Sequence, residues 1–198
     1  MPNNSLSRHW DALNQSAIRW KGWIPTNSHR NIANYFDKTI DGRNLDLCCG
    51  FYPHVTNSIG LDISAFALEQ NQYIGKEINR PYQETLLYNL NDLEISPLPF
   101  KDNSFESATL VSGWNYIDPI EKLIDEVKRV LVPDSYFYVV QYVGNAIDND
   151  FQYVVNVWDE FAVRMDTPVN IHAKLFRLGY ETTTEEIDNE TEVVIAKL

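Results

Sequence analysis

The feature that most constrains the fold of this chain is the short spacing between two apolar segments, each containing an aspartate. "NLDLCC" at 44–49 and "SIGLDIS" at 58–64 both have the pattern of short buried strands, and the second ends at Asp62. Gly50 lies only 12 residues before Asp62. A crossover between parallel strands generally needs about 10–12 residues or more, most of them helical. Residues 51–58 can hardly hold that helix, so we expect a shortened crossover.

The chain around these segments alternates between strand and helix patterns. We expect a helix in "AFALEQNQYIGKEI", a strand near Thr85–Tyr88 and another in "SFESATLVSGW" that ends near Ser112. The continuous apolar run "SYFYVVQYV" is typical of a strand buried on both faces of a parallel sheet. This alternation predicts an α/β three-layer domain with a mostly parallel sheet.

The clearest helix signal is "DPIEKLIDEVKRVL". Asp118 has the pattern of an N-cap, with Pro119 at the first helical position and Glu121 completing a capping box. An apolar stripe at helical spacing follows: Ile120, Leu123, Ile124, Val127, Val130 and Leu131. Pro133 and Asp134 should end the helix.

Aromatic helical segments are expected at both sides of this central region. They span residues 5–40 and "DFQYVVNVWDEFAVRM", and a further helix in "VNIHAKLFRLGY" should end at Gly179. The last two strands, "ETTT" and "EVVIAKL", should form an antiparallel edge.

Charge and hydropathy exclude several classes of function. The net charge of −12 makes nucleic acid and anionic membranes poor partners, because both carry negative charge. No run of about 18 apolar residues is present, and the N-terminus lacks the apolar core of a signal peptide. We therefore expect a cytoplasmic protein of one domain that acts without membrane or nucleic acid, while its oligomeric state is not specified.

The only cysteines, Cys48 and Cys49, are neighbours. A disulfide between adjacent residues is strained, and two cysteines are too few for a structural zinc site. We interpret them as small buried side chains at a strand end, with a reactive thiol as the alternative. No metal is expected.

Residues that could bind a ligand stand at the ends of four of the expected strands. Gly50 permits close backbone approach, and Asp62 can accept hydrogen bonds from two ribose hydroxyls. Asp92 can accept a hydrogen bond from an exocyclic amine beside the backbone of Leu93, and "VSGW" offers small residues before Trp114. A single aspartate at a strand end is commonly a turn former or helix cap, so only the ordered series is informative.

Two longer motifs carry a family resemblance. "LPFKDNSFESA" at 98–108 and "DPIEKLIDEVKRVLVPDSYF" at 118–137 are similar to the small-molecule branch of the class I S-adenosylmethionine-dependent methyltransferases. The similarity covers roughly residues 40–145. It implies a Rossmann-like three-layer sandwich with a seven-stranded sheet in the order 3-2-1-4-5-7-6 and strand 7 antiparallel. It also implies one methyltransferase domain over 1–198, with 1–40 as an N-terminal helical substrate cap.

The resemblance also assigns residues to the cofactor, S-adenosylmethionine. In the glycine motif, Cys48 replaces the first glycine, Gly50 matches the second and Tyr52 replaces the third. Glu106 stands where aspartate is usual. The cofactor-binding residues that it implies are Asp46, Cys48, Cys49, Gly50, Asp62, Ile63, Asn91, Asp92, Leu93, Ser112 and Gly113.

Substrate pockets in this family are built from the N-terminal segment and the stretch after the fifth strand. The aromatic candidates for contacts with a small aromatic or amine substrate are Trp20, Trp23, Trp114, Tyr116, Tyr142 and Trp158, with core packing as the alternative for each. An oxygen acceptor would need a base, for which the candidates are His54, Tyr116, Tyr142 and His172. None has a partner visible in the sequence, so no catalytic residue is assigned.

Three functions remain open at this point. The first is transfer of a methyl group to nitrogen or oxygen of a small molecule. The second is a non-catalytic domain that binds S-adenosylmethionine or a partner, which the altered glycine motif favours. The third is another nucleotide-dependent enzyme such as a dinucleotide oxidoreductase, against which the missing Gly-x-Gly-x-x-Gly pattern argues.

Overall fold

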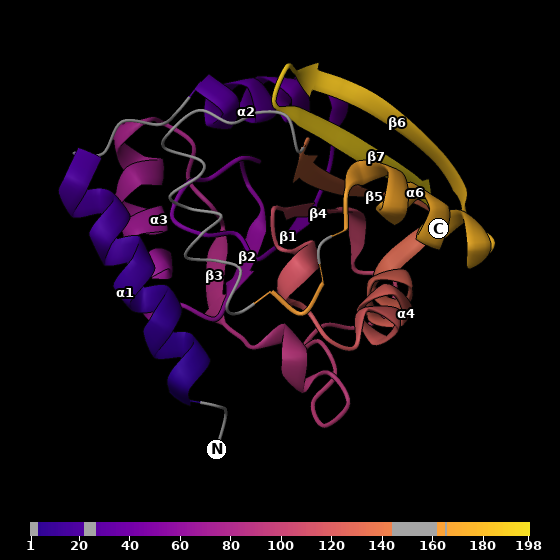
Figure 1. Ribbon diagram of the computed structural model, residues 1–198, viewed down its shortest axis with the longest axis horizontal. Coiled ribbons are helices and arrows are strands. Elements are labelled where there is room, and N and C mark those ends of the chain that lie inside the picture. The colour runs from indigo at the N-terminus through magenta and orange to yellow at the C-terminus, as the bar shows by residue number, and fades with distance from the viewer. Residues whose placement is uncertain (1–3, 22–26, 144–161, 165) are drawn as a thin grey trace.

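A computed structural model describes residues 4–21, 27–143, 162–164 and 166–198. Its centre is a seven-stranded sheet in the order β3-β2-β1-β4-β5-β7-β6, which confirms the expected topology (Figure 1). Strand β7 runs antiparallel to both neighbours, and the other pairings are parallel. The strands are β1 (Asn44–Leu47), β2 (Ile59–Asp62), β3 (Glu84–Leu87), β4 (Phe105–Val111), β5 (Leu131–Tyr142), β6 (Glu181–Asp188) and β7 (Thr191–Lys197).

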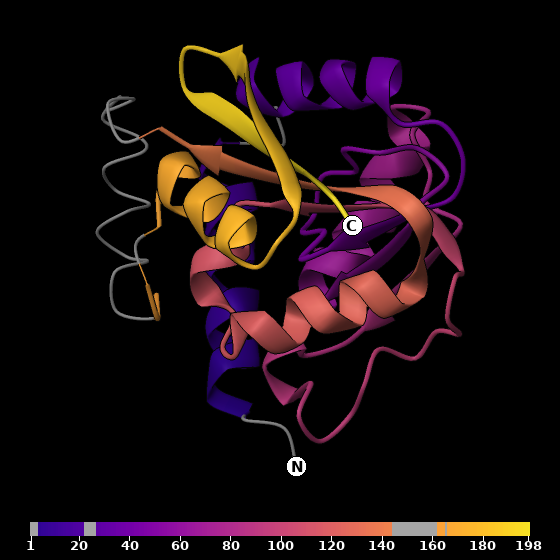
Figure 2. The ribbon, with the colours of Figure 1, turned by 90° about the vertical axis from the view of Figure 1, so that its right-hand side faces the viewer.

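Helices cover both faces of the sheet, as Figure 2 shows with the sheet seen close to edge-on. The larger core combines apolar side chains of the strands with those of α4 (Ile120–Val130) and α6 (Pro168–Arg177). Smaller clusters on the other face involve α2 (Asn27–Thr39) and α3 (Ala65–Glu77). The remaining helix, α1 (Asn4–Lys21), packs against α3. None of the helices in the described ranges has the length and apolar character needed to cross a bilayer.

The crossover from β1 to β2 contains turns and bends but no helix, as its length predicts. Buried side chains of the crossover itself, including Tyr52 and Val55, pack against α2 and its neighbours. The ring of Tyr82 lies over Gly60 of β2, so close that a Cβ added to this glycine would come within 2.7 Å of it. Side chains from the crossover and from the segment before β3 therefore occupy the space beside the sheet that a crossover helix would otherwise take.

The start of α4 differs from the expected capping box. The helix begins at Ile120, and Pro119 occupies the cap position without a side-chain hydrogen bond. The carboxylate of Asp118 instead forms an ion pair with Arg164 at 3.3 Å. A reciprocal bond of the kind found in capping boxes occurs at α6, where the Asn170 side chain accepts from the Thr167 N–H at 3.1 Å. The expected apolar stripe is buried, but α4 ends at Val130, so Leu131, Pro133 and Asp134 belong to β5 rather than to the end of the helix. Gly179 follows α6 with a φ of +90°.

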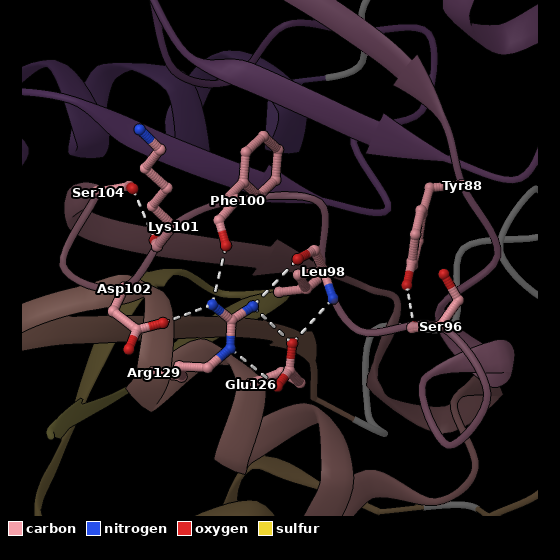
Figure 3. Close-up of polar contacts among 9 residues, drawn as sticks. All are labelled: Tyr88, Ser96, Leu98, Phe100, Lys101, Asp102, Ser104, Glu126 and Arg129. Carbon is pink, nitrogen blue, oxygen red and sulfur yellow. Dashed lines mark hydrogen bonds and ion pairs between the residues drawn. The ribbon is translucent and has the colours of Figure 1, made fainter.

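The two long sequence motifs meet in one polar cluster, drawn in Figure 3. Arg129 of α4 donates to the carbonyls of Leu98 and Phe100 at 3.0 and 2.8 Å. It also pairs with Glu126 at 2.8 Å and with Asp102 at 2.8 Å. Glu126 in turn accepts the backbone N–H of Leu98 at 2.8 Å, and the bond from Arg129 holds its pKa below the usual range. The motifs thus fasten the long connection between β3 and β4 onto α4.

We expect Arg129→Ala to lower the free energy of unfolding by about 2 kcal/mol, because it removes charge-assisted bonds and leaves Glu126 without its partner. Lys101→Ala is the matched control, since it removes an exposed cation from the same connection and should change stability by less than about 0.5 kcal/mol. Equilibrium unfolding in urea measures both. Equal losses in the two variants would contradict the fastening role.

Candidate functional site

The carboxyl ends of β1, β2 and β4 lie side by side in the sheet, and Asp62 is the residue that joins the first two. Its Oδ2 accepts the N–H of Gly50 at 2.9 Å, and its Oδ1 accepts the N–H of Ser64 at 2.8 Å. Gly50 has a φ of +58°, and apart from its own atoms and its two chain neighbours no atom lies within 4 Å of the position that a Cβ would take. The Gly50 turn and the first residues after β2 are therefore held together by one carboxylate beside open space.

Tight packing brings the end of β4 against the turn after β1. A Cβ on Gly113 would lie 2.8 Å from the Cβ and Sγ of Cys48, so only glycine allows this approach. Cys48 itself has a φ of +53°, and Ser112 has a φ of +57°. The buried Ser112 hydroxyl has no hydrogen-bond partner among the described residues.

Cys49 is buried, and its N–H donates to the Leu61 carbonyl at 2.9 Å. Burial raises the pKa of both thiols well above the ordinary value, and the nearby carboxylates of Asp62 and Asp46 raise them further. Both groups stay protonated at neutral pH. These surroundings favour small packing residues over reactive thiolates.

Asp46 lies beneath this site in a buried polar network. Its carboxylate accepts from the hydroxyl of Tyr82 and, at 2.8 Å, from that of Thr109. Asn44, on the same face of β1, donates to Thr109 at 3.0 Å and to Ser58 at 3.1 Å. Burial raises the pKa of Asp46 to about 6, although the two hydroxyl bonds act in the opposite direction. The structure thus places Asp46 below the strand ends, with its oxygens already engaged.

The segment after β3 brings three further predicted residues to the same edge. Asn91 and Asp92 belong to a short 3-10 helix, η1 (Leu90–Asp92), and Leu93 follows it in the core. The Asn91 amide donates to the Tyr116 carbonyl at 3.1 Å and accepts the Asp118 N–H at 2.7 Å. Asn91 is thereby committed to joining η1 to the segment before α4, whereas the Asp92 side chain is half-buried beside it. Ile63, directly after β2, is also half-buried.

Helix α1 contributes residues that sequence reasoning missed. Asp11 accepts from the Ser64 hydroxyl at 2.6 Å and from the Phe66 N–H at 3.1 Å. Asn14 donates to the same hydroxyl at 3.2 Å. The ring of Trp10 meets that of Tyr116 edge-to-face, with centroids 5.1 Å apart. No local signal identifies Asp11, because its partners are more than 50 residues away.

Only some of the aromatic residues that were predicted to contact the substrate lie within the described residues. Trp114 is fully buried, and its indole N–H donates to Asp166 at 2.9 Å, so its ring packs in the core. Tyr116 and Tyr142 are half-buried, and burial is the main cause that raises the pKa of Tyr142 to about 12. Trp23, Trp158 and the side chain of Trp20 lie outside the described residues, as does nearly all of the expected helix "DFQYVVNVWDEFAVRM".

The two histidine candidates for a base lie in different places. His54 is buried in the crossover, where its Nε2 lies 2.9 Å from Nδ1 of His29. Burial lowers the pKa of His29 to about 4 and that of His54 well below the ordinary value, so both rings are neutral at pH 7. His172 lies on α6, stacked on Phe176.

Comparison with known proteins agrees with this geometry. The family model for the methyltransferase domain matches residues 41–139. A demethylmenaquinone methyltransferase of Desulfitobacterium hafniense is 27% identical over 143 residues, which cover 66% of this chain and 53% of that protein. A ubiquinone/menaquinone biosynthesis C-methyltransferase of Brucella canis is 30% identical over 93 residues, covering 46% of this chain and 32% of that protein. The chain thus spans about half the length of these curated relatives, or less.

A solved structure gives the same fold over nearly the whole chain. A Thermotoga maritima S-adenosylmethionine-dependent methyltransferase, named as a possible histamine N-methyltransferase, superposes with a TM-score of 0.65. The match covers 96% of this chain and 98% of that one at 17% sequence identity. At that identity the likeness establishes the fold alone.

The buried Asp46 predicts a specific pH dependence of stability. Its pKa is raised in the folded state, so the unfolded chain loses this proton first as the pH rises. Between about pH 4 and pH 6 the folded state binds more protons, and stability falls with rising pH by roughly 3 kcal/mol at most. Asp46→Asn should lack this decline, so its stability relative to the parent should rise across that window. A constant difference in urea unfolding from pH 4 to 7 would contradict the raised pKa.

Proposed function

The chain belongs to the methyltransferase domain family, and we propose that it moves a methyl group from S-adenosylmethionine to a small aromatic molecule. S-adenosylmethionine is the cofactor expected for this family and fold. The observation that carries the proposal is the Asp62 carboxylate, which joins the turn after β1 to the start of α3 beside open space at Gly50.

The residues present fit this cofactor. Each oxygen of Asp62 accepts one backbone N–H and retains a lone pair for a hydroxyl of a vicinal diol. The Ser112 hydroxyl is buried without a partner among the described residues at the end of β4, where it can bond a polar group of the methionine moiety. Asp92 and Leu93 stand at the end of the neighbouring segment, where Asp92 can accept a hydrogen bond from the adenine amine.

In methyl transfer, the main roles of these residues are to position the cofactor and to exclude water from the reacting centre. Bound S-adenosylmethionine supplies an electrophilic methyl group on a sulfonium centre. Asp62 and Ser112 fix its position, and Gly50 allows close approach of the cofactor, whereas Gly113 lets the turn after β1 pack against the end of β4. Trp10 and Tyr116 form an apolar contact at the strand ends that keeps water away from the reacting centre.

The acceptor is proposed from the aromatic residues and from the relatives. Tyr116 and Tyr142 offer rings for stacking on an aromatic substrate. The sequence suggests a nitrogen or oxygen acceptor, whereas similarity to a protein named as a C-methyltransferase adds carbon as a third possibility. His54 of the crossover and His29 of α2 are both neutral and lie against each other, so we assign no catalytic base.

Within residues 1–40, the role of substrate cap is proposed for α1 alone. The buried side chains Ile32 and Phe36 of α2 pack with Tyr138 and Val140 of β5, so α2 is a layer of the sandwich. Residues of α1 instead contact the ends of β2 and β4.

A non-catalytic domain that binds the cofactor or a partner protein is the second candidate. Tyr52 favours it, because its buried side chain replaces a glycine of the family motif and packs on His29. The absence of a crossover helix between β1 and β2 also removes the helix N-terminus that would otherwise face the Gly50 turn. Turnover distinguishes this candidate from the enzyme.

We expect S-adenosylmethionine and S-adenosylhomocysteine to bind with micromolar affinity in calorimetric titration, and NADH not to bind. Asp62→Ala should weaken both ligands at least tenfold, because it removes charged acceptors of the ribose hydroxyls. Asp62→Asn keeps the shape of the side chain and should also weaken binding. Asp41→Asn, an exposed residue, is the charge-matched control. Undiminished affinity in both Asp62 variants would contradict the ribose assignment.

Methyl transfer itself is measured with radiolabelled S-adenosylmethionine and a panel of naphthoquinols, phenols and aromatic amines. We expect labelled product from at least one acceptor, and mass spectrometry then identifies the methylated atom. Cofactor binding without turnover on any acceptor would favour the non-catalytic candidate.

A further inference from the structure

Helix α1 spans the carboxyl ends of two strands that are not neighbours. Asp11 and Asn14 contact Ser64, two residues after β2, and Trp10 contacts Tyr116, beyond the end of β4. In the sheet, β1 lies between β2 and β4. The turn after β1, with Gly50, is therefore flanked on both sides by contacts from one helix.

The contact with α3 is an N-terminal cap supplied by another helix. Ser64 caps α3 in the usual way, since its hydroxyl accepts the N–H of Ala67 at 3.0 Å. The carboxylate of Asp11 accepts the Phe66 N–H and the Ser64 hydroxyl proton. Its negative charge also stands at the positive end of the α3 dipole. One side chain of α1 thus satisfies two donors at the start of α3.

The described side chains of α1 lie at the surface of the domain rather than in its core. In the part of α1 with described side chains, residues 6–15, none is fully buried, and none belongs to the apolar core clusters. Figure 1 shows α1 along the outside of α3. The polar contact at Asp11 is therefore one of the contacts that dock α1 on α3, and it is the one that reaches the start of α3.

We propose that Asp11 is a positioning residue that latches α1 over the cofactor site, so that breaking its contact with Ser64 lets the cofactor enter and leave. The inference rests on the proposed function, because it takes the site beside Asp62 as the place of the cofactor. Asp11 acts on that site through Ser64, whose N–H is bonded to Asp62. The charge of Asp11 also contributes to raising the pKa of Asp62, after burial as the larger cause.

The latch is tested by stopped-flow measurement of S-adenosylhomocysteine binding and release. Asp11→Ala should raise the association and dissociation rate constants together, each by about threefold or more, because the cap no longer holds α1 closed. Asp11→Asn keeps an oxygen acceptor for Ser64 and Phe66, so its rates should remain within about twofold of the parent. Asp41→Asn is the control for charge.

Hydrogen exchange in the absence of ligand provides an independent measurement. The amides of residues 6–15 should exchange faster in Asp11→Ala than in the parent and in Asp11→Asn. Unchanged exchange and unchanged rates in Asp11→Ala would overturn the latch. Faster dissociation with unchanged or slower association would also overturn it, because that pattern indicates a lost ligand contact or a damaged site. Failure of the parent to bind would contradict the proposed function, and exchange would still decide whether Asp11 holds α1.

Discussion

The double hydrogen bond of Asp62 is the interaction on which the strand-end site depends. One oxygen holds the turn after β1, and the other holds the start of α3. Because the crossover between β1 and β2 contains no helix, this carboxylate replaces part of the constraint that a helix would supply. Through Ser64 the same constraint extends to Asp11 of α1. A single acid therefore connects the geometry of the turn, the start of α3 and, through Ser64, the helix α1 that we propose to cover the site.

The missing crossover helix also explains the polar interior beneath the site. Tyr82 lies over Gly60 and donates to Asp46, whose face of β1 also holds Asn44. A carboxylate is tolerated there because hydroxyl groups satisfy its oxygens, although burial still raises its pKa to about 6. On the same side, α2 and the crossover residues His54 and Tyr52 complete the layer. The shortened connection thus exchanges helical packing for a network of specific polar and aromatic contacts.

The short strand spacing was sufficient to predict the shortened crossover, and hydrophobic periodicity predicted the α/β class. The sheet order was implied by the family resemblance of the two long motifs. These motifs prove to be physically coupled, since Arg129 and Glu126 of one motif bind the backbone of the other. Local sequence patterns were less reliable for the ends of helices. Asp118 has the sequence pattern of an N-cap at the start of α4, yet its carboxylate forms an ion pair with Arg164 from a distant segment.

Long-range contacts of the site could not be predicted from one sequence. Asp11 and Ser64 are separated by 53 residues, and His29 and His54 by 25, so no periodic pattern relates them. Trp114 resembles a pocket residue because it follows small residues at a strand end, but the indole bond to Asp166 places it in the core.

We propose that the cofactor lies between Asp62 and α1. A crystal structure of the chain with S-adenosylhomocysteine tests this most directly. We predict both ribose hydroxyls within hydrogen-bond distance of the Asp62 carboxylate, beneath α1. A ligand bound elsewhere, or with its ribose directed away from Asp62, would contradict the account.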